Sequence, residues 1–309
     1  MQYDASEFTF TALAGTPLQD LIAALKVSGQ YLPFDPPLAG AGATLGGTVA
    51  AGLDGPGRFR FGGLRDFILG VRFVDGEGRL LRMGGKVVKN AAGFDLPKFF
   101  VGSLGSFGVL AEITFKVFPC PPATLTLRLP VADAPAMGRL LQGAANTPWE
   151  FDALEGSLTE RSVLARLRGP AAALASLATE VTRRWPGEIL SGEAERALWQ
   201  GLADFSWAHP DGPCWKIPLT CAALPAFSQL ASAIDDARSW IGSGGNVAFL
   251  SVPEAQRQAA EQKIALSGFS ALTLRGASTR WHGPRRDHRI AGAVKAALDP
   301  NHRFPPLHS

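Results

Sequence analysis

Cysteine is scarce in this 309-residue sequence, which contains only Cys120, Cys214 and Cys221. Their spacing matches no metal or iron–sulfur motif, and so few thiols argue against a disulfide framework, so a reducing compartment is favoured. Apolar runs are also short, and none reaches the roughly 20 residues that a bilayer-spanning helix needs. A secretory signal, with its charged start, apolar middle and small-residue cleavage site, is missing too. We therefore expect a cytoplasmic protein, and peripheral attachment through a partner would leave no trace in the sequence.

The chain also lacks a strong excess of charge of either sign. Its 30 Lys and Arg residues against 27 Asp and Glu residues give a net charge of +3, and no basic run is interleaved with aromatic residues. Nucleic acid is therefore not an expected partner. What the sequence has in plenty is glycine (35) and proline (23), which predict many turns and close backbone approaches. With 46% hydrophobic residues, the chain suits one large core or two modest ones.

The first 120 residues alternate β-prone segments with glycine- and proline-rich passages. Residues 8–14 predict a strand, and Thr16 is a candidate cap for a helix that begins at Pro17 and stops at Gly29. The apolar face of this helix is predicted to consist of Leu18, Leu21, Ile22 and Leu25. Further strands are predicted at 67–74 and 79–83, joined as a hairpin, and at 109–118.

After Pro130 the sequence changes character, with more Ala, Leu and Arg and fewer glycines. Two similar units, each a strand, a helix and a strand, are predicted at 162–167, 170–185 and 188–190, and again at 214–219, 224–241 and 246–252. A sheet with helices on one face is the expected arrangement of this separate α+β domain. A last helix is predicted over 287–298.

The most informative stretch is residues 42–52, where nearly every side chain is small. Small side chains let a bulky polar group approach the backbone closely. Thr44 offers a hydroxyl, the amides around Gly46 and Gly47 can converge as an anion nest, and a helix beginning near Thr48 would add its positive end. A dinucleotide pyrophosphate suits such a surface. The alternative is that the glycines only tighten a loop, and neither the Walker nor the Rossmann spacing is present.

Several motifs, taken in order, resemble the FAD-binding PCMH-type flavoproteins of the vanillyl-alcohol-oxidase superfamily. The motifs are Ala43-Thr44-Leu45-Gly46-Gly47, residues 61–70, 89–96 and 102–110, and Leu298-Asp299-Pro300 with Phe304. Their combination is most similar to the E-type subunit of bacterial glycolate oxidase. The resemblance is strong over about residues 8–120, weak in the middle of the chain and partial in the tail.

The resemblance implies an α+β fold, with an FAD-binding PCMH-type domain of two α+β subdomains, the first truncated, and an α+β ferredoxin-like cap. Residues 1–124 are expected to form the FAD domain, 125–280 the cap or substrate-type domain, and 281–309 a tail that returns to the FAD domain. The chain starts after the position where relatives carry a βαβ unit and a first pyrophosphate loop. A truncated record, a partner that fills the gap, and a subunit that no longer holds FAD stay open as explanations.

FAD, held non-covalently, is the cofactor that the resemblance implies, because no His or Cys stands in the loop where some relatives attach flavin. Pro33, Asp35 and Pro36 would line the flavin entrance. The pyrophosphate region would comprise Ala43, Thr44, Leu45, Gly46, Gly47, Thr48, Ala51 and Gly52. The dinucleotide channel would be shaped by Gly62, Arg65 and Asp66, and the adenine side would be met by Val109 and Leu110.

Other roles stay open for some of these residues. Arg65 and Asp66 have an ion pair as an alternative of nearly equal weight. The resemblance also brings Lys89, Asn90 and Asp95 toward the flavin ring, although capping and turn roles suit Asn90 and Asp95 equally. At two positions the sequence departs from the pattern of these flavoproteins, and each departure removes a polar contact that relatives have. Leu104 stands where catalytic relatives often carry Glu, and the tail reads Phe304-Pro305-Pro306 where Phe-Asn-Pro is common.

The function implied is that of an FAD-binding subunit of a glycolate oxidase complex, in which a small 2-hydroxy acid, glycolate, becomes glyoxylate. It would be auxiliary to a catalytic D-type flavoprotein subunit and an F-type iron–sulfur subunit. A self-sufficient FAD-linked 2-hydroxy-acid oxidoreductase with a truncated record and a cofactor-free scaffold are the alternatives. Such oxidation needs a base and cations for the carboxylate. Only His282 has a cationic, aromatic setting. A carboxylate site is one interpretation of this setting, and a solvated basic face is the favoured one.

Overall fold

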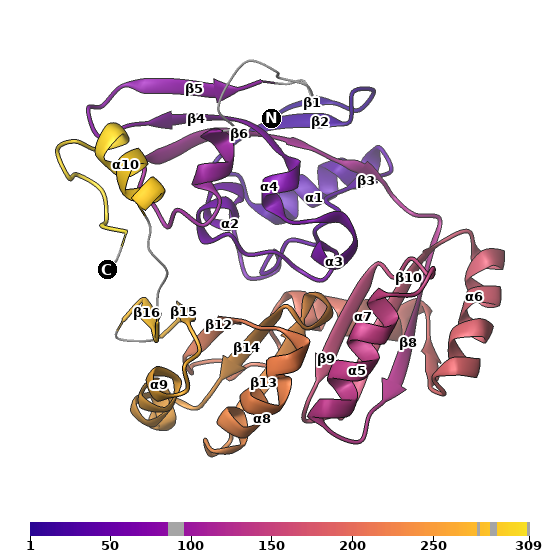
Figure 1. The fold of residues 1–309 in the computed structure, drawn as a ribbon. Coiled ribbons are helices and arrows are strands. Elements are labelled where there is room, and N and C mark those ends of the chain that lie inside the picture. The colour runs from indigo at the N-terminus through magenta and orange to yellow at the C-terminus, as the bar shows by residue number, and fades with distance from the viewer. Residues whose placement is uncertain (86–95, 277–278, 285–288, 308–309) are drawn as a thin grey trace. The chain divides into compact units, whose positions relative to one another are not determined.

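The computed structural model describes residues 1–85, 96–276, 279–284 and 289–307. The chain divides into two compact units, unit 1 with residues 1–120 and 287–309 and unit 2 with residues 121–286 (Figure 1). The sequence places the two boundaries after residues 124 and 280, a few residues from these points. Each unit has its own sheet and its own apolar core.

Unit 1 is built on a five-stranded antiparallel sheet with the order β1-β2-β6-β4-β5 (Figure 1). Its strands are β1 (Gln2–Asp4), β2 (Thr9–Leu13), β4 (Ile68–Val74), β5 (Leu80–Gly84) and β6 (Val109–Lys116). The predicted hairpin is confirmed, because β4 pairs with β5 across the turn at 75–78. Alternate strand residues face the core, where the rings of Phe10 and Phe115 stack with 6.1 Å between centroids.

Helices and short segments cover the core side of this sheet. They are α1 (Leu18–Val27), α2 (Leu45–Ala51), α3 (Arg58–Phe61), α4 (Leu64–Phe67), η1 (Leu96–Phe100) and α10 (Arg289–Leu298), with β3 (Gln30–Tyr31) paired to β7 (Phe118–Pro119). In α1 the predicted face is confirmed except at Ile22, which is 37% exposed. Thr16 does not cap this helix. Pro17 occupies the cap position, and the Thr16 carbonyl instead accepts the amide of Leu45.

Unit 2 consists of two repeats of strand–helix–strand–strand–helix–strand joined in one nine-stranded sheet, β11-β8-β10-β9-β13-β14-β12-β15-β16. The first repeat holds β8 (Ala123–Pro130), α5 (Ala134–Ala145), β9 (Ala153–Ser157), β10 (Ser162–Gly169), α6 (Ala171–Arg184) and β11 (Glu188–Leu190), followed by α7 (Gly192–Ala203). The second holds β12 (Cys214–Pro218), η2 (Cys221–Ala223), α8 (Leu224–Ser232), β13 (Arg238–Gly242), η3 (Ser243–Gly245), β14 (Val247–Ser251), η4 (Glu254–Gln256), α9 (Arg257–Leu266) and β15 (Ala271–Arg275), with β16 (Trp281–His282) at the edge. Within each repeat the order is fourth, first, third and second strand, so the ferredoxin-like expectation is confirmed.

Two details of unit 2 differ from the sequence predictions. The helix expected over 224–241 ends at Ser232, because Asp236 adopts a left-handed conformation (φ 53°) and residues 238–242 enter the sheet as β13. A further helix that the sequence analysis did not predict, α7, lies on the sheet face opposite to α5. A methionine of α5 lies over Gly156, which pairs with Val163, whereas α7 bonds to Thr126, which pairs with Arg166. Positions 163 and 166 of one strand point to opposite faces.

Candidate functional site

The predicted pyrophosphate segment forms α2, which begins at Leu45, earlier than the start expected near Thr48. Thr44 is its N-cap, and its Oγ1 accepts the amide of Gly47 at 3.2 Å. At the other end Gly52 adopts the left-handed conformation (φ 59°) that commonly ends a helix. The small residues therefore make a short, tightly packed helix between two loops.

The anion nest predicted around Gly46 and Gly47 is not present. The Leu45 amide donates to the Thr16 carbonyl at 3.0 Å and the Gly46 amide to the Ala14 carbonyl at 2.7 Å. With the Gly47 amide held by Thr44, the first donors of the helix are used within the protein. The cause is the short antiparallel bridge of Pro17 with Thr44, which lays the start of α2 along residues 14–17.

The outer side of this segment still suits close approach by a bulky polar group. Gly42 and Gly47 are exposed. A Cβ at Gly47 would meet only the Thr44 hydroxyl, at 3.1 Å, and one at Gly42 would meet open space. Because Thr44 Oγ1 accepts from Gly47, its own hydrogen remains to be donated outward. The Thr44 hydroxyl and bare backbone are therefore open to such a group, with fewer amide donors than the sequence predicts.

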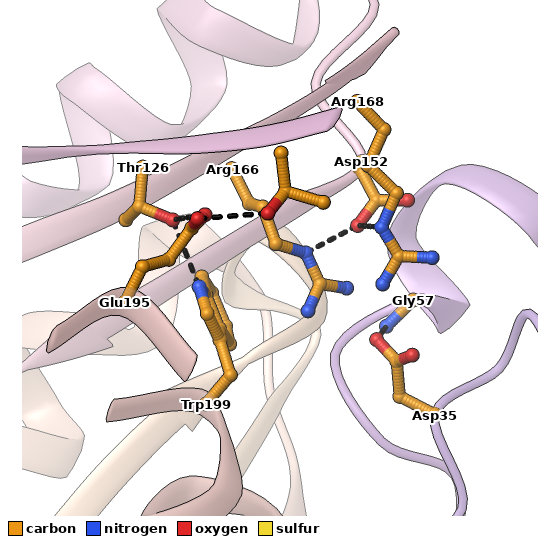
Figure 2. A network of polar contacts seen from close by, with 9 residues as sticks. Asp35, Gly57, Thr126, Asp152, Arg166, Arg168, Glu195 and Trp199 are labelled. Atoms are coloured by element: carbon orange, nitrogen blue, oxygen red, sulfur yellow. Dashed lines mark hydrogen bonds and ion pairs between the residues drawn. The ribbon is translucent and has the colours of Figure 1, made fainter. Parts of the chain in front are cut away.

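The predicted entrance residues lie in a tight loop. Pro33 and Pro36 are buried, and Asp35 is partly exposed with a left-handed backbone (φ 48°). Its carboxylate accepts the amide of Gly57 at 3.1 Å (Figure 2). A Cβ at Gly57 would lie 1.9 Å from the Pro33 carbonyl, so the two segments touch through their backbones. The prolines thus serve packing, and Asp35 is the residue of this trio that presents a polar group.

The channel residues Gly62, Arg65 and Asp66 surround the start of α4. The Asp66 carboxylate accepts the amide of Gly63 at 2.9 Å, which is a capping role. A Cβ at Gly62 would lie 2.4 Å from that carboxylate, and Gly62 also has φ 83°. Arg65 and Asp66 are exposed and do not pair with each other in the described part of the chain. The ion-pair alternative is therefore wrong.

A loop over residues 101–108 brings the end of α2 and the start of β6 together. The Gly102 amide donates to the Val49 carbonyl and the Leu104 amide to the Ala50 carbonyl, each at 2.9 Å. A Cβ at Gly52 would lie 2.9 Å from Gly102 Cα. Beyond the loop, Val109 is exposed and Leu110 packs against the core. Lys89, Asn90 and Asp95, also predicted to face the flavin, lie outside the described residues.

The tail contains a buried charged pair that the sequence analysis missed. Lys295 of α10 donates to Asp299, to the Ser106 carbonyl at 2.8 Å and to the Phe304 carbonyl at 3.1 Å. Asp299 is fully buried and accepts the amides of Arg303 and Phe304. The spacing of four residues between Lys295 and Asp299 indicates that the two side chains can pair, but on most helices such a pair lies on the surface, so the spacing does not indicate burial.

Opposing effects set the pKa of Asp299. Burial alone raises the pKa of this carboxyl group, but the hydrogen bond from Lys295 and the amide bonds from Phe304 and Arg303 lower it from 3.8 to about 2. Asp299 is therefore ionised at neutral pH.

In unit 2, burial raises the pKa of the Cys214 thiol to about 12, so Cys214 is an inert core residue.

A polar network in unit 2 joins residues of β8, β10 and α7 with Asp152 (Figure 2). Asp152 is buried and is paired with Arg166 and, at 2.9 Å, with Arg168. In the same network the Arg166 guanidinium lies 4.3 Å from the ring of Trp199. Glu195 of α7 accepts hydrogen bonds from the hydroxyls of Thr124 and Thr126, each at 2.7 Å, and Trp199 donates to Thr126 at 2.8 Å. These contacts fasten α7 to β8 and β10.

No catalytic constellation is evident in the described residues. His282 is buried, with hydrogen-bonding distances to the hydroxyls of Thr273 and Thr279, so the solvated basic face predicted for it is wrong. His209 is buried and its ring lies 2.8 Å from the Asp236 carbonyl. No group of three potential metal ligands and no helix able to cross a bilayer is found in the described ranges. A cleft of about 410 Å³ in unit 2 contains none of the predicted contact residues.

Comparison with known proteins gives a separate line of evidence about the family that this chain resembles. Residues 1–84 match the sequence family described as FAD binding domain. Glycolate oxidase subunit GlcE of Escherichia coli (strain K12) is 39% identical over 225 residues, which cover 71% of this chain and 60% of that protein. Glycolate oxidase subunit GlcD of Bacillus subtilis (strain 168) is 33% identical over 127 residues, or 41% of this chain and 27% of that protein. The chain therefore spans 60% or less of the length of these relatives.

A solved structure of alkyldihydroxyacetonephosphate synthase matches 98% of this chain and 65% of its own chain, with a TM-score of 0.68 and 17% identity. The fold is thus the FAD-binding PCMH-type fold that the sequence predicts, with mixed helices and antiparallel sheets. Over residues 1–84 the chain is similar to the FAD binding domain family, and over 225 residues it resembles the E-type subunit of glycolate oxidase.

Proposed function

We propose that this chain is an FAD-binding subunit of a glycolate oxidase complex, and that unit 1 holds the cofactor. The observation that carries the proposal is that the matched FAD binding domain contains α2, whose outer side offers the Thr44 hydroxyl beside exposed glycine backbone. Residues 42–52 would face the diphosphate, Asp35 and the region of Gly62, Arg65 and Asp66 would border the dinucleotide, and Val109 and Leu110 would meet the adenine side.

The bound flavin would supply hydride and electron transfer. The protein would hold the flavin without a covalent bond, which suits an exposed surface of backbone and one hydroxyl. Because the first donors of α2 are internally bonded, this surface alone offers weak contacts. From the resemblance to the E-type subunit, we expect a catalytic D-type flavoprotein subunit beside this chain, and an F-type iron–sulfur subunit to accept the electrons. Peripheral attachment at the inner membrane would come from the complex.

The Thr44 hydroxyl gives the first test of this proposal. Thr44→Val removes the donor, and a lost charge-assisted hydrogen bond of about 1.5–3 kcal/mol should raise the Kd for FAD by roughly ten- to a hundredfold. Flavin fluorescence during titration of the protein measures that Kd. Thr44→Ser keeps the hydroxyl and should bind like the wild type.

Thr44→Val also removes the N-cap of α2, so a control is needed for the loss of stability that this causes. Asp133 caps α5 in unit 2, where its carboxylate accepts the Ala136 amide at 2.7 Å. Asp133→Ala should cost about 1 kcal/mol of stability, as Thr44→Val does, yet leave the Kd for FAD unchanged. Equal Kd values for the valine and serine variants of Thr44 would contradict the proposed contact.

The auxiliary role predicts that this chain alone does not oxidise glycolate. His209 and His282 are both buried and hydrogen-bonded, so neither is presented as a base to a 2-hydroxy acid. Glycolate-dependent reduction of an electron-accepting dye should appear only when the chain is co-purified with a D-type subunit. Turnover by the chain alone would favour the self-sufficient oxidoreductase, and a wild type that takes up no FAD would favour the cofactor-free scaffold.

A further inference from the structure

The C-terminal helix reaches the loop that supports α2. Lys295 is buried in α10, and its Nζ donates to the Ser106 carbonyl at 2.8 Å. Ser106 is itself buried, and its amide donates to the Ser103 carbonyl at 2.9 Å. Lys295 therefore fixes the middle of the 101–108 loop from a point far along the sequence.

The same loop is bonded to the carboxyl end of α2. The amides of Gly102 and Leu104 donate to the carbonyls of Val49 and Ala50. Leu104 has a left-handed backbone (φ 49°), which a bulky residue adopts only when its surroundings enforce it. The loop continues directly into Val109, so its position sets both α2 and the start of β6.

Lys295 is well suited to act as a fixed anchor. Its three donors go to Ser106, Asp299 and Phe304, so its position is determined by three acceptors. Asp299 in turn holds the amides of Arg303 and Phe304 and lies against Gly76, where a Cβ would come within 2.4 Å of its carboxylate. The anchor is thus tied to the β4–β5 turn as well as to the tail.

We propose that Lys295 is a positioning residue for the FAD surface of unit 1, and that it acts through the Ser106 carbonyl and the 101–108 loop on α2 and β6. This inference rests on the proposed function. A surface that binds through bare backbone and one hydroxyl has little side-chain adaptability, so its affinity depends on how firmly the backbone behind it is held.

Lys295→Met tests the inference by removing the anchor while keeping an unbranched chain. At a temperature where the variant stays folded, its Kd for FAD should rise tenfold or more. In FAD-free protein, hydrogen exchange should quicken at the amides of Gly102 and Leu104. Lys26→Met replaces an exposed lysine of α1 in the same unit and should change neither quantity.

Further variants separate positioning from folding. Lys295→Met leaves Asp299 buried without its cation, so the paired change Lys295→Met with Asp299→Asn removes both charges and should fold more readily. It should weaken FAD binding as the single change does. Lys295→Arg retains a cationic donor and should restore the Kd to within about threefold of the wild type.

The outcomes are distinguishable. Suppose that the wild type binds FAD, and that Lys295→Met and the double variant Lys295→Met/Asp299→Asn, while folded, bind FAD as tightly as the wild type does. The positioning role is then overturned and the proposed function stands. Faster exchange confined to the tail, with Gly102 and Leu104 unchanged, overturns it too. A wild type that binds no FAD overturns the proposed function and this inference together.

Discussion

Replacing Gly46 by alanine is expected to lower the free energy of unfolding by about 3 kcal/mol. A Cβ there would lie 2.7 Å from the Cβ of Ala14 and 2.9 Å from the Ala14 carbonyl oxygen. The helix cannot move away, because the Gly46 amide is bonded to that same carbonyl. Denaturant unfolding measures the loss, and the Kd for FAD should rise as well because α2 is displaced.

Gly47 is the matched control one residue along the same helix. Its Cβ would meet only the Thr44 hydroxyl, at 3.1 Å, and alanine is the better helix former by about 1 kcal/mol, so stability should change little. If FAD approaches this exposed backbone, Gly47→Ala should still weaken binding about tenfold. A Gly46→Ala variant as stable as the wild type would contradict the close packing of α2 against Ala14.

Asp299→Asn is expected to destabilise the protein by about 3 kcal/mol at neutral pH, because it leaves the buried Lys295 without its counter-charge. The effect should depend on pH. Since the pKa of Asp299 is about 2 in the folded protein and 3.8 as its ordinary value, its contribution is complete above about pH 4 and is lost as pH falls toward 2. Urea unfolding of both proteins across that range measures the difference.

The expected result is that the stability gap between wild type and Asp299→Asn closes as pH falls from about 4 to about 2. Asp20→Asn is a suitable control because Asp20 is an exposed residue of α1 in the same unit. It should give a small gap with no comparable change over this window. A gap for Asp299→Asn that stays constant from pH 4 to 2 would contradict the depressed pKa.

Local signals in the sequence predicted much of the fold. The hairpin of β4 and β5 followed from the turn residues between 75 and 78, and the buried face of α1 followed from helical spacing at three of its four positions. The ferredoxin-like cap came from the resemblance and from repeated strand–helix–strand patterns. The end of α8 was not predicted, because the left-handed turn at Asp236 has no glycine or proline to mark it.

The candidate site was harder to predict because long-range contacts decide it. Small residues from 42 to 52 correctly indicated close backbone packing, but the partner of the Gly46 amide is Ala14, far earlier in the chain. Because of that contact, the amides at the start of α2 donate within the protein and do not form the predicted anion nest. The burial of Lys295 likewise depends on Ser106, a contact that the helical spacing of the tail could not reveal.

Hydrogen exchange of the wild type with and without FAD reports where on the protein the cofactor binds. FAD-dependent protection is expected in peptides from residues 40–52 and 101–110 of unit 1, with no comparable change in unit 2. Protection absent from these two segments, or found only in unit 2, would contradict the proposal that unit 1 holds the cofactor.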